Sequence, residues 1–192
     1  YETFVETLSK YSGSKRVFEI LMNGINEDLF YPQLHGLTHF NILQWLLSLQ
    51  NHDLDTIRAF ENRMVGITSK KDPESGNKLM IALSSISKEQ IEEQIKDIRN
   101  SCILFENIFG YRSKSFIAPV YTWNRVIEKT LLEEDIEYLQ GSQYQLEPLI
   151  EENGKINKVK HHLGKRNELG QIYLIRNSYF EPSADCTRDW VN

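Results

Sequence analysis

The sequence predicts an α/β protein in which helices cover parallel strands. Segments with apolar residues at helical spacing alternate with short apolar runs typical of buried strands. The predicted order is helix, strand, helix, helix, strand, helix, strand, and such alternation indicates parallel strands because each crossover needs a helix. An apolar fraction of 40% and a mean hydropathy of -0.46 are typical of a folded globular chain.

Composition excludes several classes of partner. The net charge is -5 and the charges of both signs are interspersed, so no basic stripe predicts a nucleic-acid partner. No apolar run approaches the ~20 residues of a membrane span. The two isolated cysteines fit a reducing compartment, and we expect a cytoplasmic location. We expect residues 1–192 to form one α/β domain that is incomplete at both ends, because the last residues predict the start of a new helix.

The first half of the chain predicts mostly helices. Helical spacing of apolar residues is found in 1–11, 42–50 and 53–65. The apolar residues of 15–25 fit either a helix or a strand. The run 29–34 is typical of a short strand, and the polar residues 66–78 predict a loop.

The second half contains the clearest helix. Ser87 and Gln90 form a capping box that predicts the start of this helix. Apolar residues then recur every three or four positions, and Gly110 predicts that the helix ends near Phe109. A buried strand is expected at 115–119, a helix at 123–133 and a strand at 136–141. The β-like segments 155–162 and 171–177 then predict a C-terminal hairpin.

His35 and His39 stand four apart at a predicted strand-to-helix junction, around Gly36 and Thr38. Ligands of α/β proteins bind at such junctions, and imidazole nitrogen is a good ligand for zinc and other divalent metals. A catalytic site usually needs a third protein ligand. Spacing alone does not distinguish a metal pair from a structural or surface pair, and by itself it favours the latter.

The segment 116–124 is the second candidate. A strand that ends in Ala-Pro and is followed by aromatic residues has the character of a pocket wall, with Pro119, Tyr121, Trp123 and Asn124 as candidate substrate contacts. The same residue types also fit a buried strand, a turn and a helix cap, and residue chemistry alone favours this second interpretation.

Taken together, residues 29–142 resemble the polysaccharide deacetylase family, whose members contain a NodB-homology domain. The first shared motif is a His-(Ser/Gly)-x-x-His sequence, which matches residues 35–39. The second is a strand followed by Arg-x-Pro-Tyr, which aligns with Ile117, Ala118, Pro119 and Val120. The long helix before this motif and the helix and strand after it occur in the family's order.

The resemblance implies a partial, distorted (β/α) barrel with a hairpin insertion. It also implies a metal-dependent hydrolase that removes acetyl groups from a glycan. His35 and His39 would bind a divalent metal, with zinc first and cobalt, nickel or manganese as alternatives. Pro119, Tyr121, Trp123 and Asn124 would contact the acetylated glycan.

The chain departs from the family pattern at four places. The Asp-Asp motif, which supplies a metal ligand and the base, is expected before Tyr1, and the Leu-x-His motif, which supplies the acid, after Asn192. Ile117 replaces the expected arginine, and Val120 replaces the expected tyrosine. A catalytically inactive deacetylase-like domain that binds a glycan, near Tyr121, Trp123 and Trp45, and a structural interaction domain therefore stay as alternatives.

Overall fold

A computed structural model describes Lys10 and residues 15–65, 79–152 and 154–176. The chain divides into two units, Tyr1–Gln33 and Leu34–Asn192. Most of the helix predicted at 1–11 and all of the loop predicted at 66–78 lie outside the described residues. No described helix is long and apolar enough to cross a membrane.

In the first unit, the ambiguous segment is helix α2, Lys15–Asn26. The strand predicted at 29–34 is wrong, because the chain turns back onto the end of this helix. The amides of Leu29 and Phe30 donate to the Gly24 carbonyl at 2.7 and 3.0 Å. A Cβ at Gly24 would overlap the Phe30 ring, so this reversal requires glycine.

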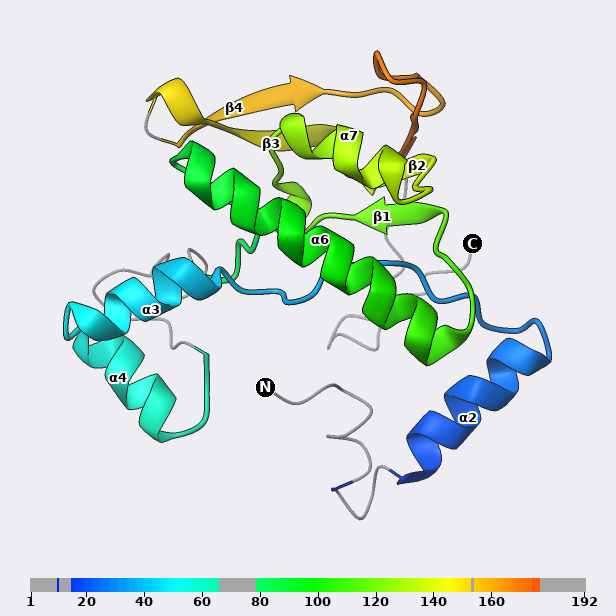
Figure 1. The fold of residues 1–192 in the computed structure, drawn as a ribbon, viewed down its shortest axis with the longest axis horizontal. Helices are drawn as coiled ribbons and strands as arrows, with labels where there is room; N and C mark the ends of the chain where they lie inside the picture. Colours follow the sequence, from blue (N-terminus) through cyan, green and yellow to red (C-terminus); the bar gives the residue numbers. More distant parts are fainter. Residues whose placement is uncertain (1–9, 11–14, 66–78, 153, 177–192) are drawn as a thin grey trace, which may run out of the picture. The chain divides into compact units, whose positions relative to one another are not determined.

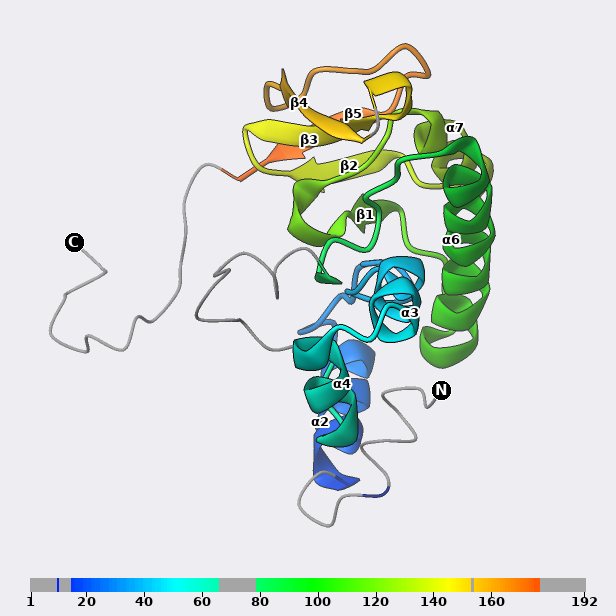
Figure 2. The ribbon, with the colours of Figure 1, turned by 90° about the vertical axis from the view of Figure 1, so that its left-hand side faces the viewer.

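A parallel sheet organises the second unit, as predicted. Its strands are β1 (Ser115–Ile117), β2 (Tyr138–Gly141) and β5 (Ile172–Ile175), in the order β1-β2-β5. Leu34 adds one parallel bridge, to Phe116. The helices α6 (Lys88–Phe109) and α7 (Val126–Glu133) lie on the same side of β1 and β2 (Figure 2). The described strands form no closed barrel.

The structure contains an antiparallel hairpin, but the predicted pairing of 155–162 with 171–177 is wrong. Strand β3 (Tyr144–Leu149) pairs antiparallel with β4 (Lys155–Lys160), whereas β5 pairs parallel with β2. The segment of β3 was missed because Gln145, Glu147 and Pro148 interrupt its apolar pattern. All three are buried in the structure.

Side-chain caps define the helices, and those predicted for α6 are confirmed. Ser87 Oγ accepts the Gln90 amide at the start of α6 (Lys88–Phe109), and Gly110 ends it with φ 77°. Asn41 caps α3 (Ile42–Gln50) and Asp53 caps α4 (Leu54–Glu61) in the same way. The other elements are α7 (Val126–Glu133) and two 3-10 turns, η1 (Pro119–Tyr121) and η2 (Ile150–Glu152) (Figure 1).

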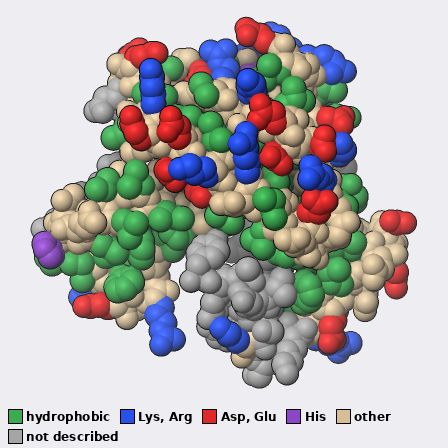
Figure 3. All heavy atoms as spheres, viewed as in Figure 1, with side chains coloured by type: hydrophobic (Ala, Val, Ile, Leu, Met, Phe, Trp, Pro, Cys, Tyr) green, Lys and Arg blue, Asp and Glu red, His purple; other side chains and the backbone are tan. Residues whose placement is uncertain are grey.

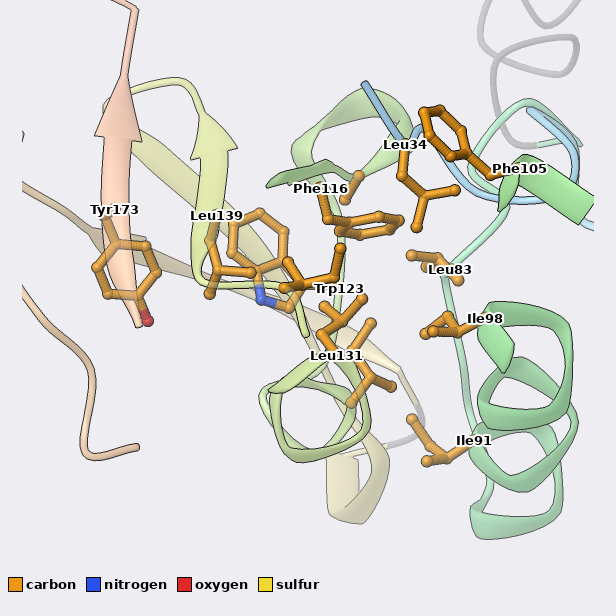
Figure 4. Packing of buried hydrophobic residues seen from close by; sticks show 13 residues of the cluster. Leu34, Leu83, Ile91, Ile98, Phe105, Phe116, Trp123, Leu131, Leu139 and Tyr173 are labelled. Carbon is orange, nitrogen blue, oxygen red and sulfur yellow. The ribbon is translucent and has the colours of Figure 1, made fainter. Parts of the chain in front are cut away.

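The apolar core lies between α6, α7 and the sheet. Ile91 and Ile98 project from α6 toward Leu131 and Leu83, and Phe116 and Leu139 project from the strands (Figure 4). Ile98, Leu131 and Phe116 are at most 2% exposed. Burial of a side chain of this size stabilises the fold by about 1.5–3 kcal/mol before the entropy cost of ordering is subtracted.

A polar cluster is buried beside this core. The Glu128 carboxylate accepts hydrogen bonds from Trp123 Nε1 at 2.9 Å, Tyr173 Oη at 3.2 Å and Asn167 Nδ2 at 2.8 Å. Tyr173 also stacks on the His161 ring, with centroids 3.7 Å apart. Three hydrogen-bond donors therefore compensate the cost of burying the Glu128 carboxylate, a residue that is 4% exposed.

The same cluster fixes the tautomer of His161. Gln145 Nε2 donates to the Trp123 carbonyl, so its Oε1 is the acceptor for His161 Nε2 at 2.8 Å. The neutral ring therefore carries its proton on Nε2. Burial, and then the charges of Arg125 and Lys165, hold the pKa of His161 below 6.5.

We predict that this histidine makes stability depend on pH. Below about pH 6.5 the unfolded chain binds more protons than the folded chain, because only the folded-state pKa is lowered. The contribution is complete above pH 6.5 and is lost as the pH falls toward the folded-state pKa. Urea unfolding at several pH values measures it. His161→Gln should flatten the pH dependence of the unfolding free energy, and His162→Gln should keep it. The same pH dependence in both variants would contradict the prediction.

Candidate functional site

The candidate site is built on residues 35–40, named here the histidine loop, which follows Leu34. The Leu34 amide donates to Ser113 Oγ at 3.2 Å, and the Leu34 carbonyl accepts the Ile117 amide at 3.0 Å. Leu34 thus runs beside β1, and the loop leaves from the carboxyl end of this pairing. That end is where ligands of parallel α/β sheets bind.

The His35 ring has a defined tautomer. Its Nδ1 lies 2.7 Å from the Ile117 carbonyl oxygen. A carbonyl only accepts, so Nδ1 carries the proton and Nε2 of the neutral ring carries the lone pair. Metal-binding histidines are commonly oriented in this way by a backbone carbonyl.

His39 lies next to His35, as the spacing predicted. The two ring centroids are 5.1 Å apart at an interplanar angle of 61°, and both residues are exposed. Gly36 turns the loop with φ 90°, a conformation that L side chains rarely adopt. Thr38 Oγ1 donates to the Phe40 carbonyl, and Asn41 then begins α3.

The pair supplies two of the ligands that a metal site needs. Within residues 15–65, 79–152 and 154–176, no three His, Cys, Asp or Glu side chains are grouped for metal binding. The lone pair on His35 Nε2 and the exposure of both rings fit a divalent metal as a partial site. A third protein ligand has to come from elsewhere.

The residues after β1 form a strained turn. Pro119 is buried at the first position of η1, and Val120 and Tyr121 both have φ 53°. Two consecutive non-glycine residues in this region cost of order 1–3 kcal/mol each. The turn leaves Val120 exposed and packs Tyr121 partly against the core.

Trp123 and Asn124 are placed inside the protein. Trp123 is 3% exposed and donates Nε1 to Glu128. Asn124 donates Nδ2 to the Pro148 carbonyl, and its Oδ1 accepts the Val126 amide. These contacts give both residues a structural role, and their contact with a substrate stays a prediction.

A cavity of about 280 Å³ adjoins the histidine loop. Gly36, Leu37 and Thr38 line it from the loop, and Phe116 and Pro119 line it from the β1 segment. Gln94 and Asp97 line it from α6. Sequence reasoning missed both polar residues because their side chains fit the polar face of an ordinary helix.

Comparisons with family models, characterised proteins and solved structures find no match to this chain. The resemblance to polysaccharide deacetylases therefore rests on the motifs themselves. The geometry adds that their residues, His35, His39 and Ile117, meet at one end of the sheet.

We predict that neutral His35 is protonated on Nδ1 and unprotonated on Nε2, because the Ile117 carbonyl accepts from Nδ1. Nitrogen NMR of the histidine side chains above pH 8 measures this. His52, which is exposed, is the control and should show a mixture of both tautomers. A predominant Nε2-protonated form of His35 would contradict the assignment.

Proposed function

We propose that the chain is part of a metal-dependent hydrolase that removes acetyl groups from a glycan, built on a partial, distorted (β/α) barrel of the polysaccharide deacetylase type. The observation that carries the proposal is the His35 ring. It stands at the carboxyl end of a parallel strand pairing, with Nδ1 bound to a carbonyl, Nε2 free to ligate and His39 beside it.

In this proposal His35 and His39 hold a divalent metal, zinc first, with cobalt, nickel or manganese as alternatives. A bound ion of this kind lowers the pKa of water and polarises a carbonyl. The Ile117 carbonyl keeps the His35 ring in its ligating orientation. The resemblance also requires a further ligand, a base and an acid, which the histidine pair does not supply.

The turn after β1 supports a substrate wall next to the pair. Ile117 connects the histidine pair to this turn. Its carbonyl accepts from His35, and the backbone after it continues into Pro119 and Tyr121. Tyr121 is half-buried, and in this proposal the exposed part of its ring packs on a sugar.

We predict that the full-length protein binds one divalent ion per chain. His35→Ala should weaken metal binding at least about a hundredfold. Mutation of a group that only orients a metal ligand already costs about 10–100-fold in affinity. His39→Ala should act similarly, and His52→Ala, at an exposed histidine outside the loop, should not. Elemental analysis and metal titration measure this. Unchanged metal content in His35→Ala would refute the site.

A second candidate is a catalytically inactive deacetylase-like domain that binds a glycan. Ile117 favours it, since the resemblance expects an arginine there to orient a catalytic aspartate, and an isoleucine side chain has no hydrogen-bonding group. His35 remains anchored, because it uses the backbone carbonyl of this residue. Metal and sugar binding without turnover would follow.

Acetate release from acetylated oligosaccharides, measured beside glycan binding, separates the two candidates. The hydrolase predicts release that chelation abolishes, and the inactive domain predicts binding alone. Either predicts that Tyr121→Ala weakens binding about tenfold, the scale of one lost aromatic contact. Tyr144→Ala, at an exposed tyrosine on β3, is the control. Equal effects of both variants would remove Tyr121 from the site.

A further inference from the structure

The cavity beside the histidine loop has the size of a small-molecule site. Its volume, about 280 Å³, exceeds the roughly 150 Å³ of an engineered cavity that holds benzene. The histidine loop and β1 form one end, α3 a second wall, and α6 the third. A ligand here would not need the histidines, so the inference below is independent of a metal.

Part of the cavity lining is apolar, and each wall contributes to it. The apolar residues are Leu43 and Leu46 on α3, Leu83 on the segment before α6, Ile98 on α6 and Phe116 on β1. Leu83, Ile98 and Phe116 belong to the buried core, whereas Leu43 and Leu46 are 42% and 43% exposed. Hydrophobic side chains accordingly gather on the face that carries α3 and α4, at the lower left of Figure 3.

The wall formed by α6 carries carboxylates. Glu93 and Asp97 are one helical turn apart and both line the cavity. Glu93 pairs with Lys96, but Asp97 has no hydrogen bond or ion pair with any described residue. Burial, and secondly the Glu93 charge, raise the pKa of Asp97. Two like charges at this spacing are unfavourable and would be relieved by a cation.

An independent feature of the same wall is a buried acceptor without a donor. Gln94 is 7% exposed and its Nε2 donates to the Ser84 carbonyl at 3.0 Å, but its Oε1 has no partner. Gln90, one turn earlier, has its Oε1 occupied by the Ile86 amide. A buried acceptor without a partner is unfavourable, so a donor from a ligand would stabilise the complex.

We propose that this cavity binds a protonated primary amine with an apolar body. The ammonium group donates to the Asp97 carboxylate and the Gln94 Oε1, and the apolar body packs against Leu43, Leu46 and Leu83. Ammonium is suited to this wall because it has three donors and no acceptor. An anionic ligand is disfavoured by Glu93 and Asp97.

The test uses benzylamine and its neutral isostere benzyl alcohol, titrated calorimetrically into the full-length protein at pH 7 with a chelator present. The two probes have the same shape, so a difference in affinity reports the charge. Benzylamine is expected to bind at least about tenfold more tightly, as for one charge-assisted hydrogen bond. Equal affinities, or no binding of benzylamine, would overturn the proposal.

Asp97→Asn should remove this preference for the amine, because it keeps the side-chain shape and loses the charge. Glu92→Gln is the matched control, since Glu92 is exposed on the same helix outside the cavity and loses the same charge. A similar loss in both variants would show a general charge effect and refute the site. Because the chelator excludes a divalent metal, failure here leaves the proposed hydrolase untouched.

Discussion

The candidate site depends on the pairing of Leu34 with β1. Ser113 Oγ accepts the Leu34 amide and also donates to the Ser115 carbonyl, so one hydroxyl joins the two chain segments. Ile117 then donates its amide to the Leu34 carbonyl and offers its own carbonyl to His35. The three hydrogen bonds that join residues 34 and 35 to residues 113–117 thus hold the His35 imidazole in a defined position.

A second backbone carbonyl fixes the cavity. The Ser84 oxygen accepts from Asn41 Nδ2 at 2.9 Å and from Gln94 Nε2 at 3.0 Å. Asn41 is also the cap of α3, so this carbonyl ties the start of α3 to the middle of α6. The histidine loop lies between the Leu34 pairing and this cap. The Leu34 pairing and the Asn41 cap therefore fix the positions of both the histidine loop and the cavity.

Local chemistry allowed the long helix α6 to be predicted, because Ser87 and Gly110 act within its first and last turns. The strand partners depend on contacts between distant segments, and β5 pairs with β2 through residues more than thirty positions apart. The proximity of His35 and His39 followed from their spacing. The burial of Trp123 did not, because its partner Glu128 is covered by Tyr173 and Asn167, which lie far away in the sequence.

In the proposed function, Ile117 separates the binding of a metal from catalytic turnover. The contact that orients His35 comes from the backbone of residue 117 and is insensitive to the side chain there. The role that the resemblance gives to an arginine at this position belongs to its side chain, which isoleucine cannot replace. Substitution here can thus leave the histidine pair intact while removing the group that positions an acid or base. The His35 geometry is therefore the same in both proposed functions, which differ only in what the side chain of residue 117 can do.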